Sequence, residues 1–588
     1  MIKPWEGNGF VHVFDGNGRV EHTEDEEGGR WEFSRVTDAA GNITYETKAL
    51  AEGDDVYNIT SYGDRTDSTG KHTSEITGPA GGMTQFTRSS DSLGVVKELP
   101  CGTELGFEYD ADPRWQTKYV KKMTETAPSG LTKTTERSKS YEDTDSDGMP
   151  DIITETVTVN GTKTTTLVQD IALAKKTVTS PEDRSVITEY DRDTLLTTKV
   201  SVTGLNDTTY GYDAKGRPET ITTGTRQTVL AYDARGNVAS VTDAEGSIFT
   251  YDYDDAGRLT AIHRPDITDV GNETVIAFGY DENGNMTVLT NPSDTDHGFG
   301  FNKVNLGSSY TTPLSGDYTY VYNKARRLIQ KNFPSPDAWI SYNYDPAKLE
   351  SIETSEGDVT DFTYYSCGSK VDTVSRGNEE IKYVYDGSLV KSEILSGTLG
   401  QTLSYDYNND FAVQRLTYAG ADCDYVYDDD GLLTGAGDFS ITRNAGNGLP
   451  EDVSGGVLSL TRTFSGYGET DAESFSADGT GLFSWSVIRD KNGRITEKTE
   501  TFPDSTTATY DYDYDAVGRL LSVTKDDAVV ESYQYDTRPY GIRTYQEVND
   551  VTRPLAYNDE DNLLTAGDVT YQHDADGFLV SRTQETDQ

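Results

Sequence analysis

A short repeat constrains this chain more than any other feature of its sequence. Tyr-Asp pairs begin at Tyr212, Tyr232 and Tyr253, and each pair is followed by two residues, a glycine, and then arginine or asparagine. The three tyrosines are separated by 20 and 21 residues. A fixed period of this size is typical of proteins in which one small unit is copied and stacked until neighbouring copies share a core.

The residues of one copy predict two short antiparallel strands and two turns. Tyr210 and Tyr212 stand two apart, so they project to the same face of an extended strand. Asp213 can accept a hydrogen bond from a backbone N–H two residues later, and Gly216 can adopt positive φ, so the chain reverses there. Residues 219–223 are rich in β-branched side chains, which favour a second strand.

The same turn recurs from the first residues of the chain to the last. Full D-x-x-G-R turns begin at Asp15, Asp213, Asp254, Asp490 and Asp515, and D-x-x-G-N variants begin at Asp38, Asp233 and Asp281. At about 21 residues per unit the chain holds at most roughly 28 units and some fifty short strands. The sequence therefore predicts an all-β chain of repeated antiparallel hairpins. Residues 1–180 are expected to hold degenerate copies, continuous with the clearer copies of residues 181–588.

Composition favours a curved wall over a thick, filled core. The hydrophobic fraction is only 34% even with tyrosine included, and tyrosine, with 38 residues, is the dominant large side chain. Its hydroxyl needs a partner or water. Tyrosine ladders across neighbouring strands can hold a sheet together while one of its faces stays wet. We therefore expect the sheet to curl into a shell.

Charge and cysteine content argue against several kinds of partner. The 100 acidic residues outnumber the 51 basic ones, for a net charge of −49, which argues against nucleic acid and anionic membranes. No apolar run approaches 18 residues, so we expect no membrane insertion. Met1–Trp5 begins no signal sequence, so any export signal is expected outside this chain. Cys101, Cys367 and Cys423 are far apart, which predicts neither a disulfide framework nor a zinc site.

The sharpest local motif follows residue 142. Asp143, Asp145, Asp147 and Asp151 would supply side-chain oxygens at positions 1, 3, 5 and 9 of a calcium-type loop. Met149 would supply its backbone carbonyl at position 7. Thr154 replaces the glutamate that ends an EF-hand loop, so the motif resembles the shorter loops of thrombospondin type 3 and dockerin-like repeats. We expect these five residues to bind one structural Ca²⁺, and an ordinary acidic turn is the alternative.

The segments YDAKGRP, YDARGNV, YDDAGRL, YDENGNM and YDAVGRL resemble the YD (Rhs) repeats of bacterial Rhs proteins, toxin-complex proteins and animal teneurins. The resemblance implies hairpins laid side by side in a long sheet that spirals into a hollow shell or tube, often around a toxin polypeptide. Family shells that carry toxins typically end in D-P-x-G motifs, where an aspartyl autoprotease acts. The Asp-Pro pairs at positions 112 and 345 do not form that motif, so no catalytic segment carries over.

Three functions remain open. The first is a non-enzymatic, exported shell, extracellular or at the cell surface, that encloses a polypeptide. The second is a filament or adhesin that binds neighbouring copies of itself through uncapped strand edges. The third is a β-propeller lectin or glycosidase, since two units would make one blade of about 42 residues. The propeller lacks a W-D signature, and we find no H-E-x-x-H, G-x-S-x-G or P-loop motif for an enzyme.

Overall fold

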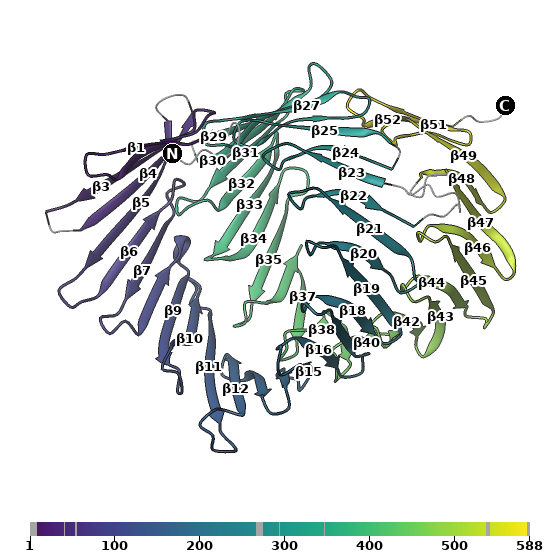
Figure 1. Ribbon diagram of the computed structural model, residues 1–588, viewed down its shortest axis with the longest axis horizontal. Helices are drawn as coiled ribbons and strands as arrows, with labels where there is room; N and C mark the ends of the chain where they lie inside the picture. The colour runs from purple at the N-terminus through teal and green to yellow at the C-terminus, as the bar shows by residue number, and fades with distance from the viewer. Residues whose placement is uncertain are drawn as a thin grey trace.

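The chain folds as one long antiparallel sheet. Figure 1 shows the computed structural model, which describes residues 9–39, 42–52, 56–265, 275–292, 294–345, 347–536 and 541–584. These residues form 52 strands of 4 to 11 residues and one short 3-10 turn, η1 (Pro100–Gly102). From β1 (Val11–Phe14) to β52 (Leu579–Gln584), each strand pairs with the next along the chain. The all-β prediction is confirmed. Met1–Trp5, considered above as a signal sequence, and Pro346, in the second Asp-Pro pair, lie outside the described residues.

The Tyr-Asp motif forms the turn that the sequence predicts. β17 (Thr208–Tyr212) pairs with β18 (Pro218–Thr223), and the register shifts between Gly211 and Tyr212. The Asp213 carboxylate accepts hydrogen bonds from the backbone N–H groups of Lys215 at 2.8 Å and Arg217 at 3.0 Å. The Arg217 guanidinium returns to the same carboxylate at 2.6 and 2.8 Å. The backbone and guanidinium of Arg217 together lower the pKa of Asp213 to about 2.

The tyrosine hydroxyl joins each unit to the unit before it. Tyr232 donates to the carbonyl of Pro218 at 2.7 Å, and Tyr253 donates to that of Val238 at 3.0 Å. The same bond to a carbonyl 14 to 21 residues earlier is made by Tyr212, Tyr280, Tyr322, Tyr344, Tyr364, Tyr407, Tyr427, Tyr514 and Tyr535. The acceptor lies at or next to the start of a strand that follows an earlier turn, so each of these hydroxyls ties its hairpin to one before it.

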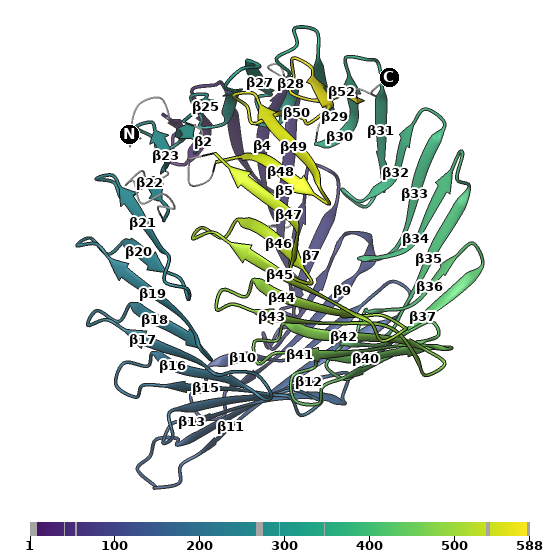
Figure 2. The same ribbon diagram turned by 90° about the vertical axis from the view of Figure 1, so that its right-hand side faces the viewer.

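The sheet coils as a spiral. Figure 2 shows the strands from β13 (Lys163–Asp170) to β22 (Leu259–His263) on one side of the curved wall, and those from β32 (Val371–Arg376) to β37 (Ala421–Tyr427) on the other. Side-chain contacts between turns join residues 241 to 301 positions apart. The wall is therefore continuous, and β14 (Lys175–Thr179) pairs with β15 (Ser185–Tyr190) across residue 180.

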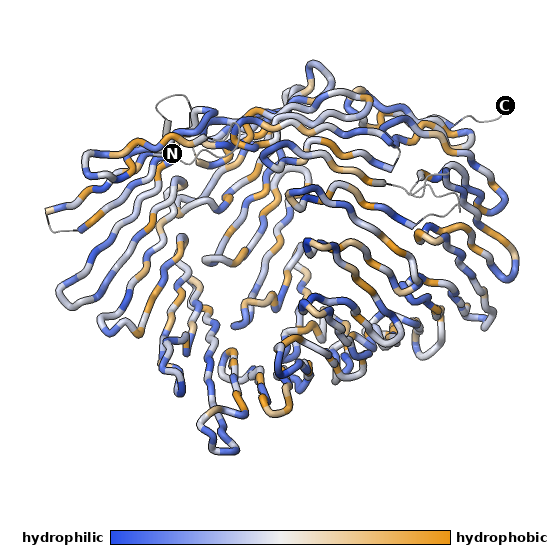
Figure 3. Tube along the Cα trace, viewed as in Figure 1, coloured by the Kyte–Doolittle hydropathy of each residue, from blue (hydrophilic) through white to orange (hydrophobic). Residues whose placement is uncertain are grey.

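The wall is thin. Within the described residues the buried hydrophobic side chains are Leu50, Ala127, Ala174, Ala261, Ala508, Val523, Ala566 and Val569. Figure 3 shows hydrophobic and hydrophilic residues interspersed along the strands, without a large hydrophobic block. The low hydrophobic fraction thus corresponds to a single curved layer, as expected. No helix in this part of the chain is long and apolar enough to cross a membrane.

The continuous pairing also corrects one expectation. The propeller hypothesis is wrong, because a propeller divides into separate four-stranded blades and this sheet does not divide. All 52 strands follow one another in a single ladder of neighbours. The alternative folds therefore reduce to one spiral wall.

Candidate functional site

The seam between successive turns determines whether a coiled sheet becomes a closed wall. We use "seam" for the contacts between loops that lie one turn of the spiral apart. The earlier loop of each contact lies within residues 25–335, and the later loop lies within residues 303–576. Its polar contacts include Asp25–Arg326, Ser129–Asp386, Lys163–Asp410, Arg184–Asp430, Arg226–Glu469 and Ser315–Glu560. Carboxylates from one turn therefore bind cations, hydroxyls or backbone N–H groups of the other.

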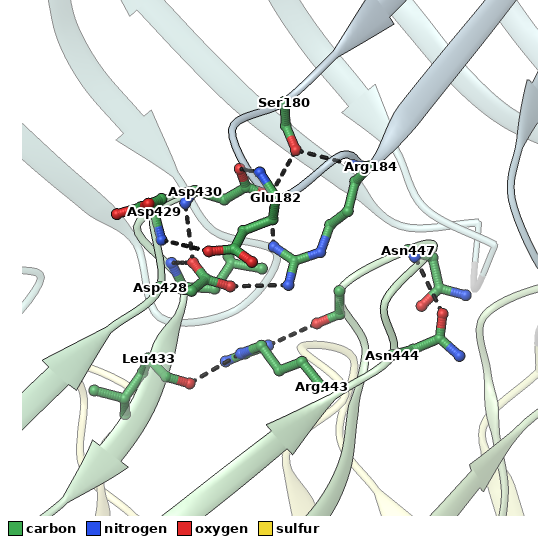
Figure 4. Close-up of polar contacts among 12 residues, drawn as sticks. Ser180, Glu182, Arg184, Asp428, Asp429, Asp430, Leu433, Arg443, Asn444 and Asn447 are labelled. Atoms are coloured by element: carbon green, nitrogen blue, oxygen red, sulfur yellow. Dashed lines mark hydrogen bonds and ion pairs between the residues drawn. The ribbon is translucent and has the colours of Figure 1, made fainter. Parts of the chain in front are cut away.

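Arg184 forms the most enclosed charged cluster of the seam (Figure 4). It lies between β14 and β15, and its guanidinium binds Asp430 at 2.5 Å and Asp428 at 2.9 Å, in the loop before β38 (Leu433–Ala436). The three side chains are only 9 to 13% exposed. Ser180 also donates to Asp430, at 2.8 Å. Burial favours loss of the proton, but the hydrogen bonds to Asp428 and Asp430 prevail and raise the pKa of Arg184.

Arg226 makes a second, bidentate contact. Its guanidinium binds both oxygens of Glu469, at 2.7 and 2.8 Å, and its guanidinium carbon lies 3.6 Å from the ring centroid of Tyr467. The Tyr467 hydroxyl accepts the backbone N–H of Thr225 at 3.0 Å. The hydrogen bonds from Arg226 lower the pKa of Glu469. This geometry favours arginine over lysine, because a planar guanidinium can bind both oxygens of a carboxylate and also stack on an aromatic ring.

Glu560 binds a backbone turn instead of a cation. Its carboxylate accepts the N–H groups of Leu314 at 3.1 Å and Ser315 at 2.7 Å, and the Ser315 hydroxyl at 2.7 Å. Burial alone would raise its pKa. The hydrogen bonds from Thr312, Ser315 and Leu314 outweigh burial and lower the pKa of Glu560 to about 2. The seam therefore depends on ionised carboxylates even where no cation is present.

Many of the seam side chains occupy a common position in the repeat. In several of the four-residue β-turns that begin with Asp, Asn or Ser, the third residue contacts the neighbouring coil of the wall. Members of this set are Glu27, Glu182, Glu245, Asp410, Asp430, Tyr467, Asn492, Glu560 and Asp576. The sequence reasoning assigned the first and fourth residues of the turn but left this variable position without a role.

One covalent bond also crosses the seam. Cys101 and Cys367 form a disulfide between residues 266 positions apart, and Cys423 is free. The expectation that these widely spaced cysteines form no disulfide framework needs correction here, because two of the three are bonded to each other. The spacing misled because a spiral brings loops separated by one full turn into contact, which a count of intervening residues does not reveal.

The expected calcium loop lies between β11 (Thr132–Glu142) and β12 (Ile152–Val159), at the lower end of the molecule in Figure 1. Carboxylate oxygens of Asp143, Asp145 and Asp151 lie within 4.8 Å of one another. This all-oxygen donor set is of the kind that Ca²⁺ prefers. Asp147 is not in that group. Its carboxylate accepts the Met149 backbone N–H at 2.6 Å, and the Met149 side chain is exposed.

Part of the loop is held by its own residues. Asp151 accepts the backbone N–H of Thr144 at 2.7 Å and also its hydroxyl, and these bonds lower the pKa of Asp151. Gly148 donates its backbone N–H to Asp143 at 2.9 Å and has a φ of 89°. The structure thus brings together three of the four expected carboxylates around a glycine bend.

Comparisons with known proteins agree with the repeat geometry. The family model described as Teneurin YD-shell matches residues 5–587. Human teneurin-4 is 28% identical over 258 residues, which cover 41% of this chain and 9% of that protein. Zebrafish (Danio rerio) teneurin-3 is 25% identical over 358 residues, which cover 57% of this chain and 12% of that protein. The chain thus spans about a tenth of the length of these curated relatives.

Among solved structures, the crystal structure of TcdB2-TccC3 is similar to this chain with a TM-score of 0.40 and 11% sequence identity. The alignment covers 96% of this chain and 32% of that one. The family match over nearly the whole sequence, the Tyr-Asp turns and the single spiral sheet point to one assignment. The chain belongs to the teneurin YD-shell family.

Proposed function

We propose that this chain is a non-enzymatic wall segment of an exported β-shell, extracellular or at the cell surface, that encloses a polypeptide. The observation that carries the proposal is the seam, which joins the first turn to the second from Asp25 to Ser335. A coiled ribbon with free turns would let a polypeptide pass between them, whereas a joined one retains it. The role requires a mechanically continuous surface and no reacting group.

The acidic composition supports the exported location. A net charge of −49 keeps a large, thin wall soluble through mutual repulsion, provided that cations screen it. The disulfide between Cys101 and Cys367 favours an oxidising compartment. Both observations fit a protein that works outside the cytosol.

Electron microscopy of the purified chain tests the enclosing role. A hollow body of uniform size supports the shell. End-to-end threads would favour the alternative of a filament or adhesin built from neighbouring copies, and would count against enclosure. A protease-sensitive polypeptide fused to the C-terminus should also survive digestion longer than the same polypeptide alone.

We also propose that Asp143, Asp145, Asp147, the Met149 carbonyl and Asp151 bind one structural Ca²⁺. The three clustered carboxylates repel one another unless a cation lies between them, and this repulsion supports the proposal. Calcium should raise the melting temperature of the chain, and the double substitution Asp145→Ala and Asp147→Ala should abolish that rise. Asp193→Ala, in another exposed acidic turn, is the matched control. A melting temperature that is the same with and without a chelator would contradict the calcium proposal.

A further inference from the structure

Two loops of the seam are joined covalently. Cys101 lies in η1, between β8 (Gly94–Glu98) and β9 (Glu104–Ala111). Cys367 lies between β31 (Val359–Tyr364) and β32. Their disulfide closes a segment of 266 residues, about one full turn of the wall. The bond therefore ties the first turn to the second.

The forces at this point differ from those along the rest of the seam. Loops 99–103 and 365–370 are fully described, and within them no ion pair or hydrogen bond between the two loops accompanies the disulfide. Loop 365–370 instead packs closely against two loops of the first turn. A Cβ added to Gly368 would lie 3.4 Å from the Gly82 Cα and 3.6 Å from the Pro100 Cβ. This contact thus depends on the bond and on close fit rather than on charge.

The Cys101 backbone lies in the left-handed region, with a φ of 69°. Hydrogen bonds within its own loop hold that conformation, from the Leu99 N–H to the Thr103 carbonyl at 2.8 Å and from the Gly102 N–H to the Leu99 carbonyl at 3.1 Å. Both cysteines are half-buried rather than enclosed, and a small thiol can therefore reach them.

We propose that Cys101–Cys367 is a redox latch on the seam. A dithiol reductant supplies two electrons and two protons: its own thiols become a disulfide, and the Cys101–Cys367 bond becomes two thiols. The hairpin ladder is not involved, so loops 99–103 and 365–370 separate while the sheet persists. The biological sense of the latch rests on the proposed exported shell, which would stay closed outside the cell and loosen in a reducing compartment.

Hydrogen exchange of the purified full chain, measured by mass spectrometry with and without dithiothreitol, tests the latch. Reduction should accelerate exchange about tenfold in residues 99–103 and 365–370 and leave residues 238–253 unchanged. Cys101→Ser should show the faster exchange without any reductant. Cys423→Ser is the matched control, because that cysteine is free in the structure, and it should keep the response to reductant.

Alkylation of the denatured, unreduced chain gives an independent readout. One labelled thiol is expected, and three would overturn the latch outright. If the disulfide is present but its reduction leaves hydrogen exchange unchanged, the latch is also overturned, because the bond would then have a structural role without controlling separation of the loops. These results do not depend on what the wall encloses. Failure of the shell in electron microscopy is therefore distinguishable from failure of the latch.

Discussion

The guanidinium carbon of Arg217 lies 4.0 Å from the ring centroid of Tyr232, in the next unit of the repeat. The same arrangement joins Arg258 to Tyr280, Arg494 to Tyr514 and Arg519 to Tyr535, at 4.3 to 4.9 Å. Each of these arginines also binds the aspartate of its own turn. The arginine of D-x-x-G-R thus fixes its own turn and supports the tyrosine that follows.

Replacing Arg217 should loosen two neighbouring units. Arg217→Gln removes the ion pair with Asp213 and the contact with the Tyr232 ring, and we expect a local loss of about 1–2 kcal/mol. Hydrogen exchange over residues 208–232 measures it, since a long repeat array does not unfold as one two-state unit. Lys215→Gln, in the same turn, should change little. Equal effects of the two substitutions would refute a special role for the arginine.

The Tyr253 hydroxyl should contribute to local stability in addition to the packing of its ring. Tyr253→Phe leaves the Val238 carbonyl without its 3.0 Å donor, at a cost of about 1 kcal/mol. Exchange of residues 238–253 should increase accordingly. Tyr251→Phe is the control, because its hydroxyl makes no hydrogen bond within the described part of the chain. If both variants exchange alike, the hydroxyl does not join the units.

Acid should open the seam at Glu560. The pKa of this carboxyl is lowered from 4.5 to about 2 in the folded chain, so its stabilising contact is fully present above about pH 4.5. The contact is lost as the pH falls from 4.5 through about 2, because the protonated carboxyl accepts the turn N–H groups poorly. Exchange of residues 312–316, measured between pH 6 and pH 2 and corrected for intrinsic rates, should show this. Glu560→Gln should remove the pH dependence and Asp559→Asn should retain it.

Loss of Arg184 should separate the turns locally. Arg184→Ala leaves Asp428 and Asp430 facing each other with little access to water, which costs about 3–5 kcal/mol when such a pair is broken. Exchange should rise in residues 180–184 and 428–432 and stay unchanged in the β17–β18 hairpin. Arg192→Ala removes an exposed arginine from a nearby turn and should have no such effect. Unchanged loops in Arg184→Ala would mean that the charged cluster does not hold the seam.

The repeat chemistry could be predicted from the sequence, and the contacts between turns could not. Asp213, Gly216 and Arg217 act within one turn, so local spacing is enough to assign them. The partners of Arg184 and Cys101 are set by the circumference of the wall, which depends on strand tilt and curvature over hundreds of residues. An acid, amide or tyrosine at the third turn position is only a partial signal for the seam, because Asp193 carries it in an exposed turn.

The third turn position also constrains how such a wall can change in length. Arg184 meets Asp430 because a fixed number of hairpins lies between them. Deleting one pair of strands from that interval would offer Arg184 the following loop along the chain, around Asn447 and Gly448, and every later pairing would shift in the same direction. We therefore expect shells of this construction to tolerate added hairpins at their ends far better than insertions or deletions between two residues that meet across the seam.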